Sequence, residues 1–173
     1  NSTSDGILVF KSAHGVAIGD RVKVSGKVTE FYGEGFAEKT TTDLTITEIE
    51  ATTITKNGTA ALPAPIKLGV DRIAPTEIID NDQFATFDPE EDAIDFWESI
   101  EGMYAQVDDG KVIALQKDGL VWVVPKNYPT NVNPGGLRIT ATDTNPDRIG
   151  VDVRNGSTAN KSYRAKMGYF FTG

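Results

Sequence analysis

The feature that most restricts the fold is a long run of alternating polar and apolar residues at 21–31, with Gly26 near its centre. Side chains along a β-strand point to opposite faces in turn, so this pattern predicts a half-buried strand that bends or bulges where the side chain is missing. Three further segments rich in branched side chains predict strands, at residues 6–11, 36–41 and 45–55. Four strands with short turns predict an OB-like small barrel over residues 1–60.

The next segment has a different composition. Residues 61–86 contain prolines at positions 63 and 65, which remove backbone donors and hold the preceding residues extended. We therefore expect a Pro-containing acidic linker rather than a central strand.

One helix is expected, over about residues 89–101. Asp88 is placed to cap it, Pro89 suits its first turn and Glu91 completes a capping box. The three-residue spacing of Ile94, Trp97 and Ile100 predicts its buried face.

Beyond the helix, short apolar runs separated by turn residues predict five more strands, at 103–107, 111–116, 120–125, 137–142 and 148–153. The helix and these strands form a second β module over residues 87–173. The expected fold is therefore mainly β, an OB-like barrel packed on a second β module with one short α-helix.

Composition excludes several classes of function. The 173 residues contain no cysteine, which excludes thiol catalysis, disulfides and zinc sites of the cysteine type. A net charge of −8 argues against a broadly basic surface for duplex nucleic acid. The one histidine, His14, lies in a glycine-flanked segment with no serine or acid partner nearby, and no catalytic motif is present. We expect no catalytic residue and no enzyme activity of this chain.

Acidic residues are concentrated in one part of the sequence. Residues 71–101 hold eleven Asp or Glu against the single base Arg72. Carboxylates are the hard oxygen ligands that calcium prefers. The candidate calcium ligands are Asp80, Asp82, Asp88, Glu90, Glu91 and Asp92, although their spacing is not that of an EF-hand. The alternative is a solvated acidic face with a capped helix start, and no other cofactor is required.

A second candidate site is aromatic and basic. Single-stranded nucleic acid is held by aromatic platforms interleaved with cations. The residues that fit this description on the first barrel are Lys23, Lys27, Phe31, Tyr32, Phe36 and Lys39. The alternative is that these aromatic residues belong to the core or the rim. A third possibility, polysaccharide binding, depends on aromatic residues such as Trp122 and Tyr128 being exposed.

Several segments together resemble a known family. Residues 6–10 (GILVF), 16–28 (VAIGDRVKVSGKV) and 62–65 (LPAP) resemble the OB-fold-like accessory region of large secreted bacterial nucleases of the endonuclease/exonuclease/phosphatase family. Residues 87–103 (FDPEEDAIDFWESIEGM) resemble the segment that follows in those proteins, and residues 145–149 (NPDRI) resemble a later element. The resemblance covers nearly the whole chain.

The resemblance implies a function. Such proteins place this region ahead of a catalytic domain on a chain exported to the cell surface or medium, and their catalytic residues belong to that downstream domain. We therefore expect an extracellular or cell-surface bacterial accessory module that helps to position nucleic acid or the catalytic domain. The competing expectation is a structural spacer or protein-interaction module, rigidified by calcium.

The resemblance also bears on partners. The family has one or two strands ahead of the segment that matches residues 6–10, so we expect a barrel truncated at its N-terminus. The strand at 6–11 would then present unpaired backbone groups, which favours a homodimer through that edge. The apolar runs are too short to cross a bilayer, so no membrane insertion is expected.

Overall fold

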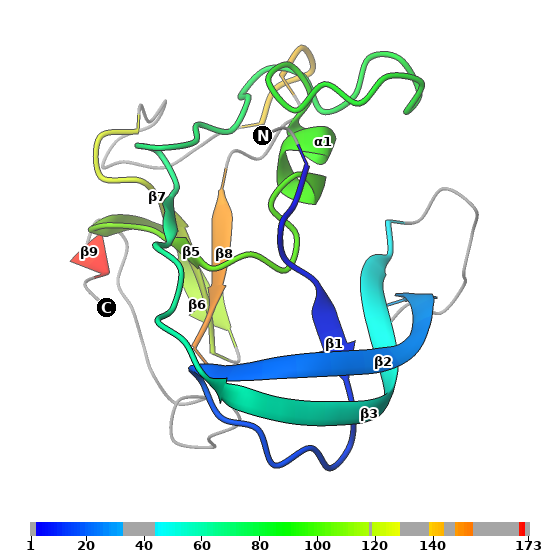
Figure 1. Ribbon diagram of the computed structural model, residues 1–173. Coiled ribbons are helices and arrows are strands. Elements are labelled where there is room, and N and C mark those ends of the chain that lie inside the picture. Colours follow the sequence, from blue (N-terminus) through cyan, green and yellow to red (C-terminus); the bar gives the residue numbers. More distant parts are fainter. Residues whose placement is uncertain are drawn as a thin grey trace. The chain divides into compact units, whose positions relative to one another are not determined.

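The computed structural model describes residues 3–32, 44–117, 119–128, 139–143, 148–153 and 170–171. In chain order the elements are β1 (Leu8–Phe10), β2 (Asp20–Phe31), β3 (Ile46–Thr59), β4 (Ile66–Lys67), α1 (Ala93–Glu98), β5 (Ala105–Gln106), β6 (Gly110–Lys117), β7 (Leu120–Val124), β8 (Ile149–Asp152) and β9 (Phe170–Phe171) (Figure 1). The mainly β class with one short helix is confirmed for this part of the chain. No helix in it is long and apolar enough to cross a membrane.

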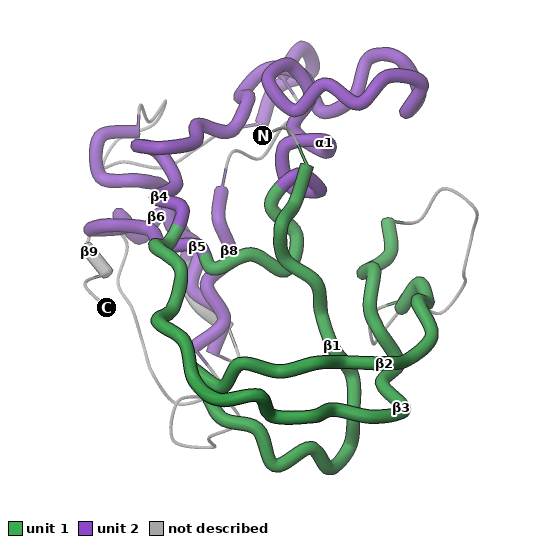
Figure 2. Tube along the Cα trace, in the orientation of Figure 1, with its two compact units in different colours: residues 1, 3–65, 100–104 green, residues 2, 66–99, 105–173 purple. Residues whose placement is uncertain are grey.

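The chain divides into two compact units (Figure 2). Unit 1 comprises residues 3–65 and 100–104, and unit 2 comprises residues 66–99 and 105–173. Residues 66–86, expected as a linker, are therefore part of unit 2. The described strands form three sheets, and each of them is open, so a closed barrel is not observed in these residues.

Unit 1 is built on a three-stranded sheet in the order β1-β3-β2. β2 runs antiparallel to β3 along almost its whole length, and the short β1 pairs parallel to the other side of β3. Among the described strands β1 therefore lies at an edge, with the side chains of Leu8 and Phe10 exposed. A dimer through this edge stays a prediction.

The bulge predicted at Gly26 is present in β2. The register between β2 and β3 shifts between Ser25 and Gly26. A Cβ atom at Gly26 would lie 2.3 Å from the carbonyl oxygen of Glu50, closer than any real Cβ contact. Only glycine allows the two backbones to approach in this way, so the missing side chain sets the position of the bulge.

Residues 100–104 belong to unit 1 because they pack against its N-terminal segment. The Ser4 hydroxyl donates to the carbonyl oxygen of Glu101, and the backbone N–H of Thr47 donates to the Glu101 carboxylate at 3.3 Å. A Cβ atom at Gly6 would lie 2.3 Å from the carbonyl oxygen of Gly102. This contact therefore requires a glycine at position 6.

Unit 2 contains an antiparallel four-stranded sheet in the order β8-β7-β6-β9. Its core consists of Val112, Val121 and Val123, all at most 1% exposed. The strand predicted at 120–125 from its apolar run is present as β7. β4 and β5 pair in parallel and form a separate two-stranded sheet.

The helix α1 is anchored by its buried face. Phe96 is 1% exposed, and the Arg72 guanidinium lies 5.1 Å from the centre of its ring. Arg72 also donates to the Ser99 hydroxyl at 2.8 Å, and that hydroxyl donates to the carbonyl oxygen of Phe96 at 2.6 Å. These contacts hold the end of the helix against the segment that follows β4.

The helix starts four residues later than predicted, at Ala93. The expected cap, Asp88, instead uses its backbone carbonyl to accept from the N–H groups of Glu91 and Asp92, which closes a turn before the helix. Asp92 is the N-cap residue and makes no side-chain cap bond. The buried face also differs from the prediction, because Trp97 is 38% exposed.

One predicted strand is not observed where the structure describes it, since residues 139–142 of the expected strand at 137–142 form no strand. The expected strand at 36–41 lies outside the described residues, as do Phe36 and Lys39.

Candidate metal centre

The acidic residues of unit 2 are brought together where the chain enters α1. The N–H groups of Ala93 and Ile94 donate to the carbonyl oxygens of Ile78 and Ile79, at 3.1 and 3.2 Å. Helix N-termini carry N–H groups without a partner inside the helix, and here the preceding segment satisfies two of them. The loop of residues 80–92 is thereby closed against the start of the helix.

The first half of this loop is folded around two carboxylates. Asp80 accepts from the backbone N–H of Phe84 at 3.2 Å, and Asp82 accepts from that of Ala85 at 2.9 Å. Gln83 and Phe84 both have a φ near +60°, in the left-handed region that side chains other than glycine rarely adopt. The turn therefore costs backbone strain, and the carboxylates offset part of it.

Five aspartates make up what we call the acidic cluster: Asp80, Asp82, Asp88, Asp92 and Asp95. Their oxygens gather in two overlapping triads. In the triad of Asp80, Asp82 and Asp92, and in that of Asp88, Asp92 and Asp95, one oxygen from each residue lies within 4.8 Å of the other two. Asp92 belongs to both.

Two oxygens of the cluster are buried without a partner. Asp92 is 1% exposed, and its Oδ1 atom accepts no hydrogen bond; the same is true of Oδ1 of Asp88. The other oxygen of Asp92 accepts only a long bond, 3.4 Å, from the N–H of Asn81. Buried polar atoms in folded proteins nearly always have a partner, so these oxygens are the atoms of the cluster best placed to ligate a cation.

The pKa values of the carboxyl groups in the cluster reflect this burial. Burial raises the pKa of Asp88 and of Asp92 above the ordinary value, and neighbouring carboxylates raise both further. Asp82 differs, because a hydrogen bond from the Thr86 side chain, with backbone N–H groups, lowers its pKa. A divalent cation would favour the ionised form of all three.

The cluster includes four of the six acids predicted as calcium ligands. Glu90 and Glu91 are exposed and outside both triads, and Glu91 accepts instead from the side-chain amide of Asn81 at 3.0 Å. Asp95 was not predicted. It accepts from the N–H of Asp88 at 2.8 Å, and its position three residues after Asp92 puts both on one helix face. That spacing is the signal that could have identified it.

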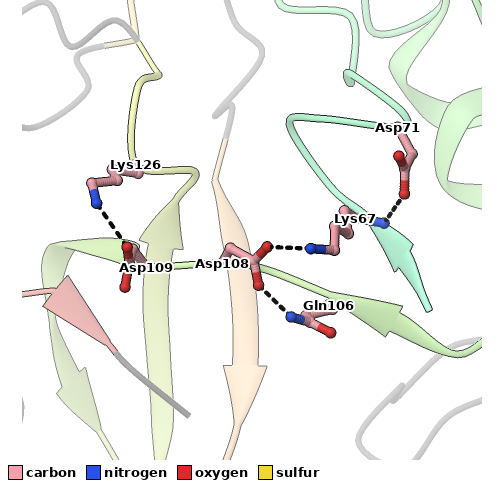
Figure 3. A network of polar contacts seen from close by, with 6 residues as sticks. All are labelled: Lys67, Asp71, Gln106, Asp108, Asp109 and Lys126. Atoms are coloured by element: carbon pink, nitrogen blue, oxygen red, sulfur yellow. Dashed lines mark hydrogen bonds and ion pairs between the residues drawn. The ribbon is translucent and has the colours of Figure 1, made fainter. Parts of the chain in front are cut away.

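Other carboxylates of unit 2 are paired with lysines (Figure 3). Lys67 lies 2.9 Å from Asp108, and Lys126 lies 2.8 Å from Asp109. The backbone N–H of Lys67 donates to Asp71 at 2.9 Å, and the side-chain amide of Gln106 donates to Asp108. None of the ion pairs in the described residues includes a member of the acidic cluster.

The predicted nucleic-acid residues that the structure describes lie on or just after β2. Lys23 and Lys27 are exposed, Phe31 is 40% exposed and Tyr32 is half-buried. Lys27 stands opposite Glu50 in the register of β2 with β3. The structure thus places three of the six predicted residues along β2 and Tyr32 directly after it, with an acid opposite one of the two lysines.

The remaining candidates have other environments. His14 is exposed, and its Nδ1 atom accepts from the N–H of Val16 at 3.1 Å. The ring of Trp122 is covered by the Arg148 guanidinium, 4.2 Å from its centre, and Tyr128 is half-buried. Neither aromatic side chain forms the open platform that a polysaccharide site needs.

The site and the fold define a mainly β protein of two units, the second of which carries a partly buried carboxylate cluster. Over residues 67–173, more than half of its length, the chain matches the family described as a domain of unknown function (DUF8508), and it belongs to that family. The matched segment begins one residue after unit 2 does. No curated protein and no solved structure matches the chain.

Proposed function

We propose that this chain is a non-catalytic accessory module of an exported bacterial nuclease, and that its unit 2 is rigidified by calcium. The observation that carries the calcium proposal is the pair of buried carboxylate oxygens, on Asp88 and Asp92, that have no hydrogen-bond partner. The role beside a nuclease is supported by the sequence resemblance, which implies a downstream catalytic domain on the same chain.

The chemistry of the cluster favours calcium over other cations. All its ligands are carboxylates, and these hard oxygens do not favour the softer transition metals. Calcium accepts six to eight oxygens in flexible geometry, whereas magnesium demands a near-ideal octahedron and keeps several waters. A loop with backbone strain at Gln83 and Phe84 supplies irregular geometry, which suits calcium.

A bound cation would change the energetics of unit 2. Without it, carboxylates that are buried close together repel one another and lack solvation. With it, the same groups link the loop of residues 80–86 to the start of α1. The loop and the helix would then move as one body, which is a property that a spacer between domains requires.

Thermal unfolding with and without calcium tests the proposal. At a free calcium concentration 100 times the Kd, binding at one site adds about 2.7 kcal/mol to the stability of the folded state. We expect a rise of several degrees in the melting temperature on adding calcium chloride, reversal by EGTA, and a smaller rise with magnesium chloride. A melting temperature that is the same in calcium and in EGTA would contradict the proposal.

Contact with single-stranded nucleic acid is a second candidate function. It is supported by two exposed lysines, Lys23 and Lys27, on the same strand as the partly exposed ring of Phe31. Base stacking on one aromatic ring contributes about 1–3 kcal/mol. We expect a fluorescently labelled oligonucleotide to bind at low salt and Phe31→Ala to weaken it by a factor of five or more.

The matched control for this experiment is Lys56→Ala. Lys56 also lies in the sheet of unit 1, but it is engaged by Asp20 at 2.8 Å. Loss of its charge should weaken oligonucleotide binding less than Lys27→Ala does. Equal binding by wild type, Phe31→Ala and Lys27→Ala would exclude direct contact through β2.

A further inference from the structure

The ligand oxygens of the acidic cluster form two groups rather than one. Asp80 and Asp82 form one triad with Asp92, and Asp88 and Asp95 form another with it. Two oxygens bound to the same calcium ion, each at 2.3–2.6 Å, lie at most about 5 Å apart. Each triad fulfils this condition by itself, since its three oxygens lie within 4.8 Å of one another.

We propose that unit 2 binds two calcium ions and that the carboxylate of Asp92 bridges them. This inference rests on the proposed function, since it concerns the same cluster. One ion is held by Asp80 and Asp82, and the other by Asp88 and Asp95. Backbone carbonyls and water complete the six to eight oxygens that each ion takes.

The state of Asp92 supports a bridging role. A bridging carboxylate offers one oxygen to each ion. Asp92 is 1% exposed, its Oδ1 atom has no partner, and its Oδ2 atom has only the 3.4 Å bond from Asn81. Both oxygens are therefore available to a cation, although the side chain is almost completely removed from water.

The charge of the cluster supports the same number of ions. One calcium ion compensates two of its five carboxylates, and two ions compensate four. The one base within residues 71–101, Arg72, is occupied by Phe96 and the Ser99 hydroxyl. Among the described residues no lysine or arginine forms an ion pair with the cluster. A single ion would leave three of the five carboxylates without a compensating charge.

The stoichiometry of calcium binding tests this inference. Calcium chloride is titrated into the full chain by isothermal titration calorimetry, and the bound ions are counted by native mass spectrometry. We expect two ions for the wild type. We expect one for Asp82→Asn and one for Asp95→Asn, because each removes a charged ligand from a single triad, and neither ion to bind at micromolar calcium in Asp92→Asn.

The outcomes separate the inference from the proposed function. One ion in the wild type would overturn the bridged pair and leave the calcium proposal standing, whereas no ion would overturn both. Two ions in Asp82→Asn or in Asp95→Asn would overturn the assignment of the ligands. In each variant the asparagine side chain keeps one oxygen, which can still accept the backbone N–H bond that the aspartate accepts in the wild type. The wild-type count decides the number of ions even if a variant fails to fold.

Discussion

Unit 2 contains two groups of aspartates with opposite surroundings. Asp108 and Asp109 each lie under 3 Å from a lysine and are partly exposed. Water and the lysine ammonium group therefore both stabilise their negative charge (Figure 3). Asp88 and Asp92 are close to other carboxylates and have buried oxygens without a partner. The comparison teaches that the number of acids does not distinguish the two groups, whereas the presence or absence of a lysine partner does.

The pKa values of the two groups of aspartates are shifted in opposite directions. The hydrogen bond from Lys67 lowers the pKa of Asp108, whereas burial raises the pKa of Asp88 and Asp92. The first carboxylate is stabilised as an anion by the chain itself. For the other two, burial away from water disfavours the anion, and a bound cation would favour it.

The largest expected effect is the loss of calcium-dependent stabilisation in Asp92→Asn. Since Asp92 belongs to both triads, this variant should show no rise in melting temperature at millimolar calcium, where the wild type gains several degrees. The matched control is Asp109→Asn, an identical change in the same unit. Asp109 has a φ of 48°, which asparagine tolerates, so its response to calcium should equal that of the wild type.

If Asp109→Asn also lost the response, calcium would act through the general negative charge of unit 2. The distinction between the two groups of aspartates would then fail. Differential scanning fluorimetry over a series of calcium concentrations is sufficient to separate the two results.

A smaller effect, with a change of sign, is expected for Asp88→Asn. In EGTA this variant should melt a few degrees above the wild type, because it removes a charge that burial and neighbouring carboxylates disfavour. In calcium it should melt below the wild type, because a ligand is lost. If this variant melted below the wild type both in EGTA and in calcium, Asp88 would be required for the folded structure itself and not as a calcium ligand.

The pH dependence should also separate the two groups. A raised pKa in the folded state means that protonation stabilises the fold. For Asp88 and Asp92 this contribution to stability is complete below pH 3.8 and is lost as the pH rises through their raised pKa values. For Asp108 the stability is present above 3.8 and is lost as the pH falls through its lowered pKa. The second effect begins near pH 5, so between pH 7 and about 5 only the first effect operates.

In EGTA we therefore expect the melting temperature to rise as the pH falls over this range. In the double variant Asp88→Asn, Asp92→Asn the dependence should be flatter. With calcium the trend should reverse, since protons compete with the ion. A wild-type melting temperature in EGTA that falls steadily from pH 7 to 5 would contradict the assigned protonation.

Local patterns in the sequence were sufficient for much of the fold. The strand at 21–31 and its bulge at Gly26 were predicted because both signals lie within the strand. These are the alternation of polar and apolar side chains and the missing side chain at Gly26. The start of the helix was not, because the capping rules do not show that the carbonyl of Asp88 is taken by the N–H groups of Glu91 and Asp92. These hydrogen bonds close a turn ahead of the helix, so the helix starts after the residue that the capping rules select.

The candidate site was predicted in part for a related reason. Acidic composition indicated the segment and four of the five clustered aspartates. It could not distinguish Asp95, which points into the cluster from α1, from Glu91, which is exposed and bound to Asn81. That difference depends on where the helix begins: because it starts at Ala93, Asp95 lies within the helix and Glu91 lies in the turn before it.

The smallest expected effect is that of Lys126→Ala. Its ion pair with Asp109 joins side chains that are 56% and 41% exposed, and exposed pairs of this kind contribute about 0.2–1 kcal/mol. We expect a loss of stability within that range in urea unfolding, unchanged by calcium and reduced by salt. Should Lys126→Ala instead abolish the calcium response, the lysine-paired acids and the acidic cluster would be one electrostatic system, and the contrast between them would have to be given up.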